Sequence, residues 1–444
     1  MKHLTVKLLV GLLAVLIPLM CMIPAQAADQ LPAGLKAGKP YDGTQITILL
    51  HPSKQNQAIK LRTAKFTEMT GIKVDYDITP YGSLLEKITA ESVAQTGTYD
   101  AFIINAVWAP SLANFVVPLD PYFKEAGIDP KRYPKAHLDM ASYDGNIIGL
   151  PFRGHPQLLF YRKDILDKAG LKPPKTWKEL EEMAPIIKEK TGLYAMAGYY
   201  TKGSAAQNLF PWYTLLWSNG GDIFDKDLNP IFNNAAGIEA TERYASWIKK
   251  GVVPPGSLTY NEYEAIQSVA QGESTMVLVW WWVQAVLTDP KTVKAEVVGN
   301  IASVAAPGWE GKGEASCALL MPLCLASAGK NKAAAWEWMK WATDPAMEKE
   351  IVIDKSNPDT TTVVAVNYST LNDPEVNKVS GGMHAAAAKS LQVAKILPVM
   401  PEWPEVANTL EIAINNIAIG KPVKATMDKA AEEVAQIMKR SRGN

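Results

Sequence analysis

Short apolar runs alternate with helical patterns along the first third of the chain. Residues 46–50 form an apolar run between turn residues, which predicts a buried strand, and residues 73–78 alternate as a half-buried strand does. Residues 101–104 form a third apolar run. Helical patterns over 54–70 and 84–96 separate the three strands, and each pattern ends at a glycine. This order predicts a parallel sheet with helices on its faces.

A second α/β unit is predicted to begin near Phe160. Thr176 and Glu179 have the spacing of a capping box, which marks the start of a helix. Further helices are predicted at 206–219, 333–342, 410–417 and 430–437, and strands at 275–279 and around Val297-Val298. Repeats and low-complexity linkers are absent from the sequence. We therefore expect several chain segments to cross between the two units.

Length and composition limit the functional classes. A chain of 444 residues exceeds the size of one ordinary core, which favours two domains. Lys plus Arg and Asp plus Glu are both 45, and this balance argues against a nucleic-acid partner. Hydrophobic residues at 48% exclude a disordered chain. Trp, at 13, outnumbers Phe, at 9, which suits a protein that stacks against flat ligand faces.

The N-terminus has the pattern of a secretory signal. Lys2 and Lys7 precede an apolar run from Leu8 to Met22, and Ala25-Gln26-Ala27 has the small-x-small pattern of a cleavage site. The alternative is a membrane anchor, but the run is only about 15 residues long, short of the roughly 20 that a spanning helix needs. We expect residues 1–27 to be removed after Ala27 and the product to enter a Gram-negative periplasm.

Lipid attachment and metal binding are not expected. Met20 stands where a lipobox before Cys21 needs a small residue. Cys317 and Cys324 are expected to be buried free thiols, and a disulfide between them is the alternative. Neither has a Cys-x-x-Cys neighbour, and the histidines have no zinc-ligand spacing.

Motifs of catalysis are also missing from the sequence. It contains no GxSxG elbow and no phosphate-binding loop of the GxxxxGK type. Glycoside hydrolysis needs two carboxylates that face one cleft, a geometry that a sequence leaves open. We therefore expect binding without chemistry, no catalytic residue and no cofactor, with a secreted carbohydrate-active enzyme as the alternative.

Several segments, in a shared order from about residue 44 to 438, resemble family 1 extracellular solute-binding proteins, the sugar-binding receptors of ABC importers. These segments are Phe66–Val74, Tyr99–Ile104, Tyr143–Gly145, Gly149–Phe152, Phe160–Asp164, Pro173–Leu180, Trp217–Asp222, Gly272–Met276 and Asn331-Lys332. Pro173–Leu180 is especially similar to the maltose-binding branch.

The resemblance implies a two-lobe periplasmic-binding-protein fold. Each lobe is expected to be a mainly parallel sheet flanked by helices, and hinge segments cross between the lobes. The N-terminal lobe is expected to comprise 44–152 with about 300–350, and the C-terminal lobe 158–298 with about 355–440. A carbohydrate binds between the lobes of such proteins, which close by hinge motion. The closed monomer then docks on the membrane permease.

Ligand contacts are implied at loops on both lobes. On the second lobe, Trp282 matches the position of a sugar-stacking aromatic residue, with Trp281 as its alternative, and Asn208 and Trp212 match an aromatic segment. On the first lobe, Asn105 and Trp108 follow the strand 101–104, where parallel sheets bind ligands, and Lys54 and Tyr81 follow the earlier strands. The polar loop Asn357–Thr362 is a candidate for closing the cleft.

Arg153 and His155 fall in the implied first crossing between the lobes. Maltose-like members carry an acidic residue at the position of His155 and an Asp-Arg pair at the positions of Val107 and Trp108, so this chain departs from a maltodextrin site. If His155 contacts ligand, binding is expected to change between about pH 5 and 8. Arg153 pairing with an acid across the hinge is the alternative. A neutral sugar or polyol is expected first, with a sugar acid or phosphate ester as the alternative ligand.

Overall fold

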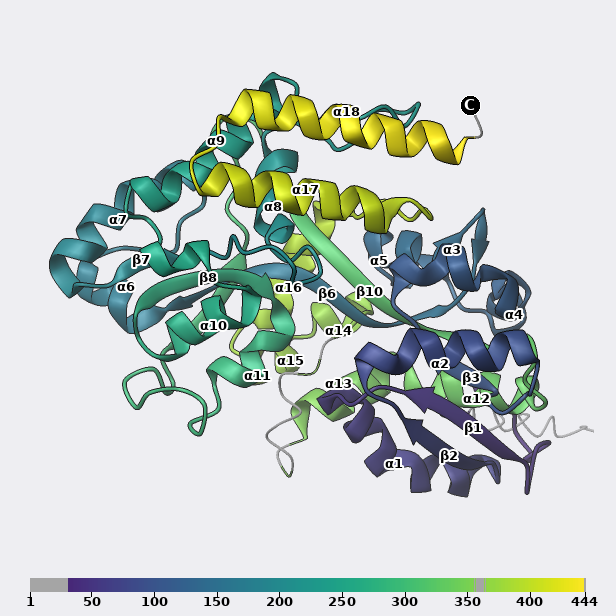
Figure 1. The fold of residues 1–444 in the computed structure, drawn as a ribbon. Coiled ribbons are helices and arrows are strands. Elements are labelled where there is room, and N and C mark those ends of the chain that lie inside the picture. Colours follow the sequence, from purple (N-terminus) through teal and green to yellow (C-terminus); the bar gives the residue numbers. More distant parts are fainter. Residues whose placement is uncertain (1–30, 355, 357–362, 364, 443–444) are drawn as a thin grey trace, which may run out of the picture.

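The computed structural model describes residues 31–354, 356, 363 and 365–442 (Figure 1). The predicted signal segment 1–27 and the polar loop Asn357–Thr362 lie outside the described residues. No helix in the described part of the chain is long and apolar enough to cross a membrane.

Nine strands form one continuous mixed sheet in the order β2-β1-β3-β10-β6-β8-β7, with β11 beside β10 and β9 beside β6. The strands are β1 (Gln45–Leu50), β2 (Lys73–Ile78), β3 (Ala101–Ile103), β6 (Leu150–Arg162), β7 (Tyr194–Ala197), β8 (Ser274–Trp280), β9 (Ile301–Ala305), β10 (Ser316–Leu325) and β11 (Ala394–Ile396), and β4 (Ser142–Tyr143) and β5 (Asn146–Ile147) form a separate hairpin. The predicted parallel pairing holds among β1, β2 and β3 and between β7 and β8, whereas the central strands run antiparallel.

Two long strands connect a first lobe, built on β1–β3, with a second lobe, built on β7–β9. Strand β6 pairs through Leu150–Pro156 with β10 and through Gln157–Arg162 with β8 and β9. Strand β10 pairs with β3 at its C-terminal end. Figure 1 shows β6 and β10 running together across the middle of the molecule. A third crossing follows β11, which pairs with the start of β10.

Helices cover both lobes. They are α1 (Lys54–Thr70), α2 (Tyr81–Ala94), α3 (Ala109–Leu112), α4 (Asp120–Ala126), α5 (Lys135–Met140), α6 (Lys163–Ala169), α7 (Trp177–Thr191), α8 (Leu209–Ser218), α9 (Ala235–Lys249), α10 (Glu262–Ala270), α11 (Gln284–Leu287), α12 (Lys332–Ala342), α13 (Pro345–Ile353), α14 (Tyr368–Leu371), α15 (Pro374–Val379), α16 (Met383–Gln392), α17 (Trp403–Ala418) and α18 (Val423–Ser441). Short 3-10 helices occur at Pro32–Gly34, Ala106–Trp108, Ala113–Phe115, Pro130–Arg132, Pro255–Leu258 and Trp281–Val283.

Helix α1 illustrates how local sequence sets the boundaries of an element. The Ser53 hydroxyl caps its start by accepting from the Asn56 amide, and Gly71 ends it with φ of 75°. A Cβ at Gly71 would lie 2.0 Å from the Asp42 carboxylate, so both the backbone conformation and the space require glycine.

The core forms two clusters of buried apolar side chains. One contains β1, β3 and α12 and extends through α16, whereas the other contains α7, α8, α9, α17 and α18. The predicted lobe boundaries remain predictions. The first cluster spans both lobes, because it contains buried residues of α10, β8 and α14–α16 as well as those of β1, β3 and α12.

Some local predictions need correction. Val297 and Val298 lie in a turn closed by the Asn300 amide on the Val297 carbonyl, and the strand begins at Ile301. Thr176 caps α7 as predicted, but the Glu179 carboxylate accepts from the Lys175 amide at 2.6 Å, one residue earlier than in a standard capping box.

The interpretation of the two cysteines as buried free thiols is confirmed. Burial raises the pKa of the Cys317 and Cys324 thiols, which keeps both in the unreactive protonated form.

Gly154 in β6 provides a test of packing at the crossing. A Cβ there would lie 2.1 Å from Cε1 of His137, which is fully buried and has little room to move. Gly154→Ala should therefore lower the free energy of unfolding by about 1–3 kcal/mol. Gly82→Ala in α2 is the control, because its Cβ meets nothing within 4 Å, and it should change stability by less than about 0.5 kcal/mol. Equal urea midpoints for the two variants would contradict this packing argument.

Candidate ligand-binding site

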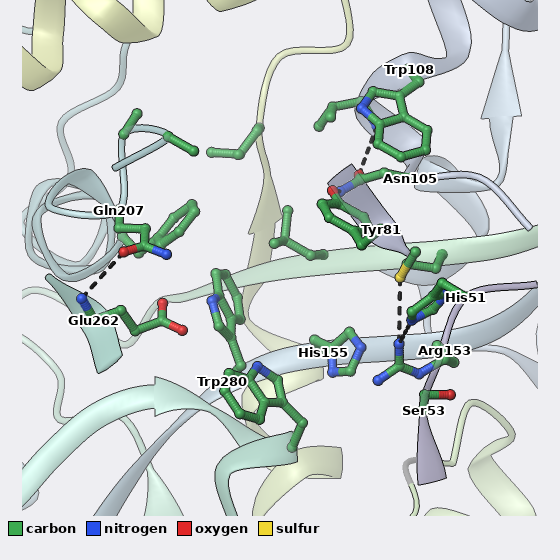
Figure 2. Close-up of a pocket in the computed structure, with 18 of the residues that line it drawn as sticks. His51, Ser53, Tyr81, Asn105, Trp108, Arg153, His155, Gln207, Glu262 and Trp280 are labelled. Atoms are coloured by element: carbon green, nitrogen blue, oxygen red, sulfur yellow. Dashed lines mark hydrogen bonds between the residues drawn. The ribbon is translucent and has the colours of Figure 1, made fainter. Parts of the chain in front are cut away.

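A cavity of about 1130 Å³ lies between the lobes, with the crossing strands as its floor. Three kinds of element line it. The first lobe contributes the loops after β1, β2 and β3, the crossing contributes Arg153 and His155 of β6 with Leu319 and Met321 of β10, and the second lobe contributes residues before α8, after β8 and along α17. Figure 2 shows the labelled side chains of the two lobes facing each other, with His155 between them.

The first-lobe wall is aromatic. Tyr81, at the start of α2, stacks on Trp108 with ring centroids 5.3 Å apart and an interplanar angle of 28°. The Asn105 side-chain amide donates to the Tyr81 hydroxyl at 2.8 Å, which fixes the ring. These residues follow the carboxyl ends of parallel strands β2 and β3, the edge at which open α/β sheets bind ligands.

The floor carries a basic group. The Arg153 guanidinium donates from Nη1 to Nε2 of His51 and lies 3.6 Å from the Met321 sulfur. Because Nε2 of His51 accepts, this ring is the neutral tautomer with its proton on Nδ1. Arg153 lies deep in the protein, and burial lowers its pKa to about 10, although part of the side chain remains accessible from the cavity. The alternative that Arg153 pairs with an acid is wrong for the described residues, since no carboxylate bonds to it there.

Burial keeps the cavity histidines neutral. The pKa of His51 is lowered to about 3, mainly by burial and further by the charge of Arg153. The pKa of His155 is lowered well below its ordinary value by burial, then by Arg153, His137 and His51. This direction runs against a His155 titration between pH 5 and 8 in the ligand-free protein, because burial and a neighbouring guanidinium both disfavour the imidazolium. The pH dependence of ligand binding stays a prediction.

The second-lobe wall combines aromatic rings with a carboxyl group. Phe210 meets Trp280 edge to face with centroids 4.8 Å apart, and Trp282 and Trp403 extend the apolar surface. Burial raises the pKa of Glu262 to about 7, and the Trp280 indole partly offsets this rise. Glu262 is therefore poised between a neutral donor and an anionic acceptor near neutral pH.

One buried carboxylate shapes the loop beside this wall. Glu411 of α17 accepts from the backbone amides of Gly203, Ser204 and Ala206 at 2.9, 3.2 and 3.0 Å. Ala205 and Ala206 have φ of 55° and 58°, a left-handed conformation that costs alanine roughly 1–2 kcal/mol per residue. Glu411 thus holds a strained loop against the cavity.

Several buried polar atoms around the cavity have no partner among the described residues. They are Nδ1 of His51, Oε1 of Gln55, Nε of Arg153, Nδ1 of His155, the Tyr213 hydroxyl and Oε2 of Glu262. Buried polar groups are normally hydrogen-bonded, so this concentration on the walls of one cavity indicates a site that a polar ligand completes.

The structure brings together seven of the ten residues predicted to contact ligand: Lys54, Tyr81, Asn105, Trp108, Arg153, His155 and Trp282. Their contact with a ligand stays a prediction.

The other three predicted residues are part of the core, and the cavity lining does not include them. The Trp212 indole donates to the Thr241 hydroxyl, Asn208 donates to the carbonyl of Glu411, and Trp281 packs on His384.

Sequence reasoning missed His51, Glu262, Trp280, Trp403 and Glu411. His51 directly follows the predicted strand 46–50, so its position at a strand end was a usable signal. Glu411 lies within the apolar pattern of a C-terminal helix, and its sequence position carries no sign of the cavity.

Residues 51–349, more than half of the chain, match the model of a family described as bacterial extracellular solute-binding protein. The chain belongs to this family.

Similar proteins agree with this solute-binding assignment. The chain is 27% identical over 359 residues to a Sinorhizobium fredii protein named "Probable amino-acid ABC transporter periplasmic-binding protein", and the match covers 79% of each chain. It is 25% identical to an ABC transporter solute-binding protein of Agrobacterium radiobacter K84 solved with ribitol, with a TM-score of 0.72 over 90% of this chain and 100% of that one. The sugar-binding protein MalE of Xanthomonas citri shares the fold, with a TM-score of 0.76, 22% identity and coverage of 90% and 98%.

Among the described residues, no group of three or more His, Cys, Asp or Glu side chains is arranged to hold a metal ion. Among the described lining residues, the carboxyl groups are those of Glu262 and Glu411, and three amides already donate to one oxygen of Glu411.

Removal of the Glu411 carboxylate should release the 203–206 loop. Glu411→Ala leaves three amide donors without their acceptor, so the free energy of unfolding should fall by about 2–3 kcal/mol. Hydrogen exchange at Gly203, Ser204 and Ala206 should accelerate. Glu405→Ala on the same helix removes an exposed ion pair with Arg440 and should change stability by less than about 1 kcal/mol. If hydrogen exchange of these amides were unchanged in Glu411→Ala, Glu411 would not be holding the 203–206 loop.

Acid should destabilise this solute-binding protein through its buried histidines. Burial lowers the pKa of His51 and His137 to about 3 and that of His384 to about 4, whereas an unfolded histidine titrates near 6.5. Below about pH 6.5 the unfolded chain binds protons that the folded chain rejects. Each histidine then lowers stability by up to about 1.4 kcal/mol per pH unit. Glu262 and Glu348, whose pKa burial raises, act in the opposite direction.

One variant tests how much His384 contributes to this pH dependence of the free energy of unfolding. His384→Gln keeps an amide donor for the Val363 carbonyl, and it should make the fall in unfolding free energy between pH 7 and pH 5 shallower by about one proton. Urea denaturation of both proteins at several pH values measures the slope. Identical slopes for wild type and variant would contradict a neutral buried His384.

Proposed function

We propose that this protein is the periplasmic receptor of an ABC importer for a carbohydrate, meaning a sugar, oligosaccharide or polyol. It binds this ligand in the cavity between the lobes and delivers it to the membrane permease. The observation that carries the proposal is the pairing of aromatic walls on both lobes with unpartnered buried polar atoms on the same surface.

Carbohydrates match both properties of the cavity. Their C–H faces pack on aromatic rings such as Tyr81, Trp108 and Trp282, and this packing needs no charge. Each hydroxyl both donates and accepts, so it can serve the unpartnered atoms of His155, Arg153 and Glu262 alike. The Agrobacterium radiobacter protein, solved with ribitol, supports a polyhydroxylated ligand.

An amino acid, suggested by the name of the Sinorhizobium fredii relative, fits the cavity less well. A volume of about 1130 Å³ exceeds the range of a typical small-ligand pocket. An α-ammonium group needs a carboxylate partner, but burial favours the neutral form of Glu262, and Glu411 is engaged by the 203–206 loop.

The proposal includes export, a hinge and the lack of turnover. Residues 1–27 direct export and are removed after Ala27, so the mature chain begins at Ala28, and intact mass of periplasmic protein checks this. The protein is a monomer that closes about β6, β10 and the β11 segment. It carries out no chemical step, so candidate sugars incubated with stoichiometric protein should be recovered unchanged.

A thermal-shift screen over sugars, polyols, sugar acids and amino acids tests the ligand class. A ligand that binds only the folded state raises the melting temperature. We expect shifts among the polyhydroxylated compounds and none among the free amino acids. Shifts confined to the amino acids would overturn the carbohydrate assignment.

Substitutions of two neighbouring tryptophans are expected to have different effects, one on ligand binding and the other on stability. Trp282 lines the cavity, whereas Trp281 is fully buried in the first core cluster. Trp282→Ala should weaken carbohydrate binding by about 1–3 kcal/mol and leave the fold intact. Trp281→Ala should instead lower the unfolding free energy by about 3–5 kcal/mol. Calorimetric titration and urea denaturation measure the two effects, and wild-type affinity in Trp282→Ala would remove that residue from the site.

A further inference from the structure

The charges around the cavity are separated by side. Among the described lining residues, the cationic side chains Lys54 and Arg153 belong to the first lobe and the crossing, whereas Glu262 and Glu411 belong to the second lobe. The described wall that the first lobe and the crossing form carries no carboxylate beside the Arg153 guanidinium.

Arg153 has unusual bonding for an arginine of this protein. The buried guanidinium groups of Arg62 and Arg162 pair with Glu350, Asp354 and Asp164, and Arg243 pairs with Glu181 and Glu310. The remaining arginines of the described chain, Arg132, Arg440 and Arg442, also donate to oxygen atoms.

Arg153 alone among the described arginines has no oxygen acceptor. Its partners are the ring nitrogen of His51 and the Met321 sulfur, and its Nε is buried without a partner. A buried guanidinium normally needs an anion or several oxygen acceptors, so a partner of this kind is missing from the described protein groups.

Further donors surround the same point. His155 lies two residues from Arg153 on the same face of β6, is 7% exposed, and has an unpartnered Nδ1. His51, 6% exposed, carries the proton on its own unpartnered Nδ1. Helix α1 begins three residues after His51, and its first turn contains no acidic residue to offset the positive end of the helix dipole.

We infer that the ligand carries an anionic group that binds Arg153 beside His51 and His155, which makes it an anionic carbohydrate such as a sugar acid. This inference rests on the proposed carbohydrate-receptor function. A carboxylate matches the planar fork of the guanidinium, and a phosphate ester offers the same oxygen acceptors. The hydroxyl-bearing part of the ligand then extends toward the aromatic walls and Glu262.

Matched ligand pairs test the inference on the wild-type protein. Calorimetric titration compares D-glucose with D-glucuronate, D-mannitol with D-mannonate and ribitol with D-ribonate, each pair differing in one oxidised carbon. The acidic partner should bind about 10- to 100-fold more tightly, as expected for hydrogen bonds to a charged partner. Glucose 6-phosphate distinguishes a phosphate ester from a carboxylate, and tighter binding of either over glucose supports the anion.

Variants locate the effect at Arg153. Arg153→Gln should abolish the preference for the acidic partner, and Arg153→Lys should restore part of that preference. Arg440→Gln, which removes an exposed arginine outside the cavity lining, should behave as wild type. Circular dichroism confirms that each variant is folded.

The outcomes separate this inference from the function on which it rests. If the wild-type protein binds the neutral partners equally or more tightly, the inference of an anionic ligand is wrong, and the proposed carbohydrate-receptor function is unaffected. Binding of neither neutral nor acidic compounds overturns both. A preference for acids that persists unchanged in a folded Arg153→Gln protein refutes the assignment to Arg153.

Discussion

The antiparallel pairing of β6 with β10 is the constraint on which the remaining architecture depends. These two strands belong to both lobes, so their register fixes where each lobe begins and which side chains face the space between them. Arg153 pairs with Met321 and His155 with Leu319, and all four line the cavity. Gly154 packs closely on His137 at this crossing, and the two walls are positioned on either side of the floor that β6 and β10 form.

The cavity walls follow from the topology on each side of that floor. In the first lobe, parallel strands deliver their carboxyl ends and the starts of α1 and α2 to one edge, which is why polar and aromatic side chains collect there. The second lobe supplies its wall differently, through the end of β8 and the long helix α17, whose Glu411 fixes a loop far away in sequence. The cavity is therefore basic on one side and acidic on the other. This asymmetry arises because different elements of the fold supply its two walls.

Sequence patterns predicted the regular elements well. The spacing of apolar residues that identifies a helix or strand also places those residues on one face of it, which is the face that the fold buries. Helix α1 was predicted over 54–70 and found there, and β2 over 73–78 likewise. Site residues were predictable where they follow a strand end, as with Tyr81, Asn105 and Trp108. Prediction failed where the position of a side chain depends on the direction in which it points or on contacts with residues far away in the sequence. Three consecutive tryptophans reveal no orientation, and only the tertiary fold places Trp281 in the core and Trp282 at the cavity.

The polar groups that line the cavity lower the stability of the ligand-free protein. Polar atoms buried around His51, Arg153, His155 and Glu262 without partners are a cost to the unliganded fold, since each lost contact with water is not replaced. An apolar cavity of equal shape would be more stable but would not discriminate among polar solutes, because specificity arises when an unsuitable ligand leaves these groups unsatisfied. The same groups therefore determine both why the empty cavity is unfavourable and why a ligand that satisfies them would stabilise the folded protein.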